Sequence, residues 1–186
     1  MIFTFANILT MMRLLLLPLI IACFYLESTY ASLAIWACFG LYALSSITDF
    51  FDGWVARKFD QVSAFGTFLD PIADKIFVAS ILLLLIAFNR IEGLWLIAVL
   101  IIFFREFLIS GLREFLGPYN VKMPVSKLAK WKTTVQMISL GILILSPLHT
   151  LALTIGQWSL VAAAILTVIT GWNYMKIGID EIKKMP

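Results

Sequence analysis

Residues 93–113 read GLWLIAVLIIFFREFLISGLR, an apolar stretch whose first interruption is the charged pair Arg105-Glu106. A helix that spans a bilayer needs about 20 predominantly apolar residues, so this stretch is long enough to cross a membrane. An arginine at that depth is energetically costly and normally faces a polar cavity instead of lipid. We therefore predict a transmembrane helix here, with Arg105 turned toward a polar interior.

The whole chain shares this apolar character. Of its 186 residues 62% are hydrophobic and 13% are charged, whereas a soluble domain carries about 25% charged residues. Lys and Arg number 14 and Asp and Glu 11, which are too few charges to coat a water-soluble globule. The composition excludes a soluble enzyme, a nucleic-acid-binding module and a disulfide-stapled secreted domain. The class that remains is an integral membrane protein. We expect membrane lipids around it and no nucleic-acid partner.

Six apolar runs separated by turn or charge signals predict an all-α protein with six transmembrane helices. The runs cover residues 8–27, 31–55, 68–89, 93–113, 131–148 and 153–175. Six spans of about 20 residues use most of the chain. We therefore expect one transmembrane domain over residues 1–186, without a second domain.

The distribution of basic residues predicts the orientation, because cytoplasmic loops of membrane proteins carry an excess of Lys and Arg. With the N-terminus inside, the second and fourth loops, the tail and the adjoining helix ends hold Arg57, Lys58, Lys75, Arg113, Lys122, Lys127, Lys130, Lys132, Lys176, Lys183 and Lys184. The outer loops hold only Arg90 as a basic residue, and Arg90, Glu27 and Glu92 have no evident partner in chemistry. We predict both termini on the cytoplasmic side of the cell (inner) membrane.

Four aspartates lie at the ends of the second and third expected helices, namely Asp49, Asp52, Asp70 and Asp74. Spacings of three and four residues put each pair on one helix face, and a short loop makes the helices antiparallel. We expect the third helix to begin near Thr67, with Pro71 in its first turn. Unpaired carboxylates at this depth would repel one another. Two divalent cations, Mg²⁺ or Mn²⁺, would neutralise them and suit oxygen ligands.

Small residues accompany the aspartates. Gly53, Ala56 and Gly66 would let a bulky ligand approach the backbone, and Arg57 offers a fork for a phosphate group. The pattern D-x2-D-G-x2-A-R-x8-G-x3-D-x3-D runs through Asp49, Asp52, Gly53, Ala56, Arg57, Gly66, Asp70 and Asp74. It resembles the signature of the CDP-alcohol phosphotransferases at every fixed position. That family also has six transmembrane helices.

The resemblance implies a two-metal site at the cytoplasmic face that cleaves the pyrophosphate of a CDP-linked substrate. It implies that one metal is bound by Asp49, Asp52 and Asp70, and the second by Asp49, Asp70 and Asp74. Asp74 would also be the general base that takes the proton of the acceptor hydroxyl. The cytidine part would be held by Asp52, Gly53, Ala56, Arg57 and Gly66.

Cations at the same membrane face argue for an anionic acceptor. Arg105, Arg113, Lys130 and Lys132 belong to the runs Arg105-Glu106, Ser110-Gly-Leu-Arg113-Glu and Ser126-Lys-Leu-Ala-Lys-Trp-Lys-Thr133. These runs resemble the phosphatidylglycerophosphate synthase branch of the family. The resemblance implies transfer of the phosphatidyl group from CDP-diacylglycerol to sn-glycerol 3-phosphate, with the four cations on the acceptor phosphate. It also suggests a homodimer.

Alternatives remain at this point. Arg13 either reaches lipid phosphate or, with Asn7 and Thr10 at helical spacing, closes the polar wall of the site. Within the family the acceptor could also be serine, inositol phosphate or phosphatidylglycerol. An intramembrane prenyltransferase would lack the D-G-x2-A-R continuation. A cation transporter would need polar residues across the midplane, where this chain is nearly all apolar.

Overall fold

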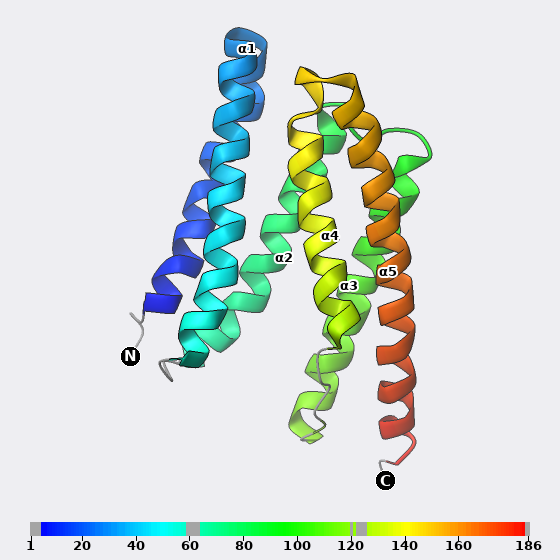
Figure 1. Ribbon diagram of the computed structural model, residues 1–186. Coiled ribbons are helices and arrows are strands. Elements are labelled where there is room, and N and C mark those ends of the chain that lie inside the picture. Colours follow the sequence, from blue (N-terminus) through cyan, green and yellow to red (C-terminus); the bar gives the residue numbers. More distant parts are fainter. Residues whose placement is uncertain (1–4, 59–63, 120, 122–125, 185–186) are drawn as a thin grey trace. The chain divides into compact units, whose positions relative to one another are not determined.

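The computed structural model describes residues 5–58, 64–119, 121 and 126–184. Within these ranges the secondary structure is helical and includes no strand (Figure 1). The elements are α1 (Phe5–Lys58), α2 (Ala64–Ala87), α3 (Trp95–Leu116), η1 (Gly117–Tyr119), α4 (Lys127–Ile144), η2 (Ser146–Leu148) and α5 (Thr150–Ile182). This confirms the all-α class.

Helix α1 consists of two arms separated at Ala31, whose backbone is non-helical with φ 37° and ψ −115°. Figure 1 shows the chain reversing its direction there. The arms, residues 5–30 and 32–58, correspond to the first two apolar runs. The reversal lies beyond the expected break at Glu27-Ser-Thr because the first arm continues as helix through those polar residues.

Ala31 is a target for stabilisation, because positive φ is strained for a residue with a Cβ and not for glycine. Replacing Ala31 by Gly should raise the free energy of unfolding by about 1 kcal/mol, and the melting temperature in detergent by about 3 °C. The matched control is Ala37→Gly, at an exposed helical position in the second arm. It should lower the melting temperature, since glycine weakens a helix interior. Equal effects of both changes would contradict strain at Ala31.

Three segments are long and apolar enough to cross a membrane, among the described residues: Asn7–Thr48, Trp95–Tyr119 and Thr150–Ile182. Helices α2 and α4 are not among these three segments, because each carries three charged side chains in its N-terminal half. These are Asp70, Asp74 and Lys75 in α2, and Lys127, Lys130 and Lys132 in α4. The three apolar segments identify the chain as an integral membrane protein.

The chain forms two compact units, of which unit 1 comprises residues 1–90 and 141–153 and unit 2 comprises 91–140 and 154–186. In unit 1, the arms of α1 pack with α2 around buried apolar side chains. Tyr42 stacks on Phe77 with ring centroids 5.8 Å apart, and Phe24 contacts Phe88 at 5.2 Å. This packing holds the N-terminal arm of α1 against the helix that carries two of the aspartates.

Arg90 is a structural residue of unit 1, with contacts that the sequence did not predict. Its buried guanidinium pairs with Glu27 and donates to the Ile144 carbonyl at 2.7 Å. It also lies over the Phe24 ring, 4.8 Å from the centroid. The last carbonyls of a helix lack intrahelical donors and attract cations. Arg90 therefore connects the first arm of α1 with the C-terminal end of α4.

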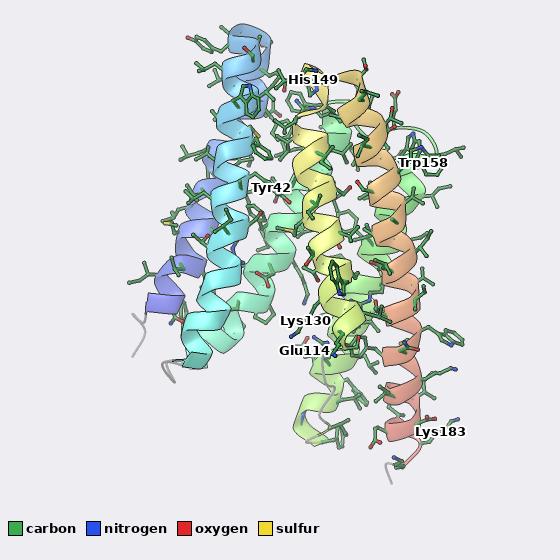
Figure 2. All side chains as sticks on the ribbon, in the orientation of Figure 1. Tyr42, Glu114, Lys130, His149, Trp158 and Lys183 are labelled. Carbon is green, nitrogen blue, oxygen red and sulfur yellow. The ribbon has the colours of Figure 1, made fainter. Side chains whose placement is uncertain are left out.

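Unit 2 contains α3, most of α4 and most of α5. Small residues of α5 let α3 approach closely, since a Cβ at Gly178 would lie 2.5 Å from Leu112 Cδ2. Trp158 and Lys183 lie toward opposite ends of α5, and Lys130 lies in the same half of the unit as Lys183 (Figure 2). The edge of Trp95 meets Trp158 at 5.3 Å. The contact between Trp95 and Trp158 thus lies in the half of this unit opposite Lys130 and Lys183.

Candidate active site

Unit 1 contains acidic candidate residues, which we call the acidic part. Asp70 and Asp74 are one turn apart on α2, and both are exposed, the Asp74 side chain by 51%. The helix begins at Ala64, three residues before the expected Thr67, because Gly66 does not interrupt it. Pro71 is therefore beyond the first turn, which corrects the expectation, and the hydrogen bond that residue 71 would donate to the carbonyl of residue 67 is missing.

The N-terminal arm of α1 supplies partners to both carboxylates. Thr10 Oγ1 donates to Asp70 Oδ1 at 2.7 Å, and the Arg13 guanidinium forms an ion pair with Asp74. Thr10, Arg13 and the neighbouring Asn7 are all buried, as their spacing of three residues on one helix face allows. Arg13 is thus turned toward a carboxylate of the site and not toward a lipid headgroup.

The structure does not describe the side chains of most of the remaining signature residues. Asp49, Asp52, Gly53, Ala56 and Arg57 lie in the last turns of α1, where the backbone is helical and the side chains are not described. Gly66 is buried in the first turn of α2. Among the described side chains no group of three or more His, Cys, Asp or Glu could hold a metal ion.

The chemistry of the described donors suits a hard divalent cation. Asp70 and Asp74 present exposed carboxylate oxygens, the ligand type that Mg²⁺ and Mn²⁺ prefer. Each carboxylate is also oriented by a donor from another helix, as is typical of metal-binding carboxylates. Asp70 and Asp74 therefore fit the role of metal ligands, with Thr10 and Arg13 as the groups that orient them.

Unit 2 contains the basic candidate residues for the acceptor phosphate, two of which contact Glu106. Lys132, which is buried, forms an ion pair with Glu106, and Arg105 donates to the same carboxylate at 3.2 Å. Arg105 also donates to Thr170 Oγ1 at 3.2 Å, and its side chain is 13% exposed. We call Arg105, Glu106, Lys132 and Thr170 the Glu106 cluster. It provides the polar surroundings expected for Arg105.

Tyr174 contacts Arg105 of the Glu106 cluster and one further cation, Arg113, through its ring. Its buried ring lies 5.6 Å from the Arg105 guanidinium and 5.1 Å from that of Arg113. Its hydroxyl accepts a hydrogen bond from the Ser126 backbone N–H at 3.1 Å. Arg113 and Lys130 are exposed, whereas Lys132 is buried and Arg105 is half-buried, so the four cations predicted to hold the acceptor phosphate differ in exposure.

Sequence reasoning missed Glu106 and Tyr174. A signal existed for Glu106, because a carboxylate within an apolar stretch needs a nearby cation. No comparable signal marked Tyr174, which is one of three aromatic residues in α5. Its position facing two guanidinium groups depends on how α5 packs against α3.

Comparison with known proteins supports the interpretation of the signature. Residues 3–169 match the family described as CDP-alcohol phosphatidyltransferase. A CDP-diacylglycerol–glycerol-3-phosphate 3-phosphatidyltransferase of Rickettsia felis is 44% identical over 173 residues, 91% of this chain and 92% of the relative. The enzyme of the same name from Pseudomonas fluorescens is 34% identical over 182 residues, 95% of this chain and 91% of its own.

A third relative carries a different name. A cardiolipin synthase (CMP-forming) of Oryza sativa subsp. japonica is 39% identical over 155 residues, 77% of this chain and 46% of the relative. The match with the family extends over most of the chain, from the Asn7 segment through the aspartates to α5. The chain belongs to the CDP-alcohol phosphatidyltransferase family.

Proposed function

We propose that the chain transfers the phosphatidyl group of CDP-diacylglycerol to sn-glycerol 3-phosphate and releases CMP. The names of the bacterial relatives support this reaction. The observation that carries the choice of acceptor is the Glu106 cluster, which holds the cations of Arg105 and Lys132 inside a helical unit. Cations that are fixed in position bind an acceptor with a phosphate group better than they bind serine, which is zwitterionic.

In this proposal the donor is bound at the acidic part of the site. Two divalent cations, Mg²⁺ or Mn²⁺, are held by Asp49, Asp52, Asp70 and Asp74. When bound, they supply positive charge that stabilises the phosphoryl group during transfer. Thr10 and Arg13 keep the carboxylates of Asp70 and Asp74 oriented. The cytidine part is contacted by Asp52, Gly53, Ala56, Arg57 and Gly66.

Asp74 acts as the general base. Its carboxylate takes the proton of an acceptor hydroxyl while the hydroxyl oxygen forms a bond to the phosphorus that carries the diacylglycerol. The bond from that phosphorus to the bridging oxygen breaks, and CMP leaves with the electron pair. The exposure of Asp74 supports this role, because a base must be reached by the acceptor. The acceptor phosphate is bound by Arg105, Lys132, Arg113 and Lys130.

The membrane arrangement belongs to the same proposal. The chain is a single domain of six transmembrane helices, with both termini and the catalytic cleft at the cytoplasmic side of the cell (inner) membrane, and it forms a homodimer. The excess of basic residues in the expected cytoplasmic loops supports this orientation. The acyl chains of the donor would then stay in the leaflet while the acceptor and CMP exchange with the cytosol.

The test is CMP release by the purified chain in detergent, measured acceptor by acceptor. With CDP-diacylglycerol and Mg²⁺ present, sn-glycerol 3-phosphate should raise the rate at least about 100-fold over no acceptor. Serine, inositol phosphate and phosphatidylglycerol should not raise the rate of CMP release. Chelation with EDTA should stop release, and Mg²⁺ or Mn²⁺ should restore it. Release with serine or phosphatidylglycerol and none with glycerol 3-phosphate would overturn the proposed acceptor.

A further inference from the structure

Glu106 occupies an unusual place for an anion, in contact with two of the four cations expected to bind a phosphate. Lys132 and Arg105 both direct their hydrogen bonds to one and the same carboxylate oxygen, Oε1. A carboxylate there competes with the acceptor for those donors. The Glu106 carboxylate must therefore have a role other than attracting the substrate.

The charge balance indicates that role. Two cations and one anion leave the Glu106 cluster with a net positive charge, so it is not neutralised within itself. A buried ion pair is in general a weak source of stability, because desolvation offsets much of the attraction. Long side chains such as Lys and Arg lose conformational freedom when they bind an anion, and a partner that already holds them reduces this loss.

Helix α5 restricts Arg105 from a second direction. A Cβ at Gly171 would lie 2.8 Å from Arg105 Cγ, so only glycine leaves the stem of the arginine its present path. Thr170 accepts from the guanidinium at 3.2 Å, and the Tyr174 ring lies 5.6 Å from it. Glu106 and α5 thus hold the same guanidinium in one conformation.

We propose that Glu106 is a positioning residue for the acceptor phosphate. It holds the Lys132 ammonium and the Arg105 guanidinium in the conformation that binds the phosphate oxygens, and it touches neither the reacting phosphorus nor the acceptor hydroxyl. This inference rests on the proposed function, since it assumes an acceptor with a phosphate group. It extends the site by a residue whose charge has the same sign as that of the ligand.

The test is the change Glu106→Gln, which keeps the shape of the side chain and removes its charge. The KM for glycerol 3-phosphate should rise about 10-fold or more, because misplaced binding groups cost at least that much. The kcat and the KM for CDP-diacylglycerol should change less than about threefold, since the acidic part is untouched. Glu106→Asp should recover part of the loss. The control Glu92→Gln, an exposed carboxylate just before α3, should match the unmodified protein.

A double mutant separates positioning from direct contact with the acceptor. In a Lys132→Met background, Glu106→Gln should raise the KM for glycerol 3-phosphate much less than it does alone, because one of the groups it positions is gone. Fully additive effects would overturn the proposal. So would an unchanged or lower KM in Glu106→Gln, the result expected if the carboxylate only weakens the attraction for phosphate.

If Glu106→Gln does not fold, two variants that change the packing of α5 against α3 test the proposal. Gly171→Ala should displace Arg105 and raise the KM for glycerol 3-phosphate, whereas Gly178→Ala, which meets Leu112, should not. Equal KM values in both variants and in Glu106→Asp would overturn the proposal. If the unmodified protein does not respond to glycerol 3-phosphate at all, the proposed function itself fails, which is a separate outcome.

Discussion

Replacing Asp74 by Asn should lower the rate of CMP release by a factor of about 10³ or more while the protein remains folded. The amide cannot take the proton of the acceptor hydroxyl, a role worth about 10² to 10⁴ in rate. It also offers one anion fewer to the two cations of the proposed site. The measurement is the initial rate at saturating CDP-diacylglycerol and glycerol 3-phosphate, with thermal unfolding in detergent as the check on folding.

The matched control is Asp180→Asn, which makes the same change at an exposed position of α5 and should leave the rate unaltered. Thr10→Val removes one hydrogen bond to Asp70 and should cost far less than loss of a carboxylate. The same severe loss is expected when Asp49, Asp52 or Asp70 is replaced. Full activity in any of these four aspartate variants would exclude the two-metal scheme.

Replacing Arg90 by Met should produce the largest loss of stability. The change leaves Glu27 without its cation and removes the donor to the Ile144 carbonyl. Breaking a buried ion pair by removing one partner costs about 3 kcal/mol or more. For a chain of this size we expect the melting temperature in detergent to fall by about 10 °C.

An exposed ion pair supplies the comparison for Arg90. Lys184 bonds to Glu181 at 2.6 Å on the protein surface, and Lys184→Met should leave the melting temperature unchanged. Glu27→Gln should be less harmful than Arg90→Met, since Glu27 is more exposed and Arg90 would keep its carbonyl partner. An Arg90→Met protein as stable as the Lys184→Met protein would show that the contacts of Arg90 contribute little.

Much of the fold could be predicted because hydrophobic length and local spacing are read directly along the chain. The stretch around Arg105-Glu106 is helical over Trp95–Leu116, close to the expected 93–113. The reversal of α1 was expected between the first two apolar runs, and it occurs at Ala31. The start of α2 was predicted less well, because Gly66 resembles a helix boundary although the helix runs through it.

The contacts of the candidate site were less predictable than its residues. The spacing of Asp70 and Asp74 indicates a shared helix face, and the position of Arg105 within an apolar run indicates a polar partner. Neither pattern identifies the partner. Arg13 was balanced between lipid and the site, and only its burial against Asp74 distinguishes the two.

The sequence alone determines an integral membrane protein of helices, the family to which it belongs and the carboxylates on which its chemistry is proposed to depend. These follow from apolar length, composition and spacing, which involve residues close together in the chain. Tertiary structure decides which charges meet: Arg13 with Asp74 across 61 residues, Arg90 with Glu27 across 63, and Lys132 with Glu106 across 26. A charge in an apolar helix must find a partner, but the packing of the helices selects which one.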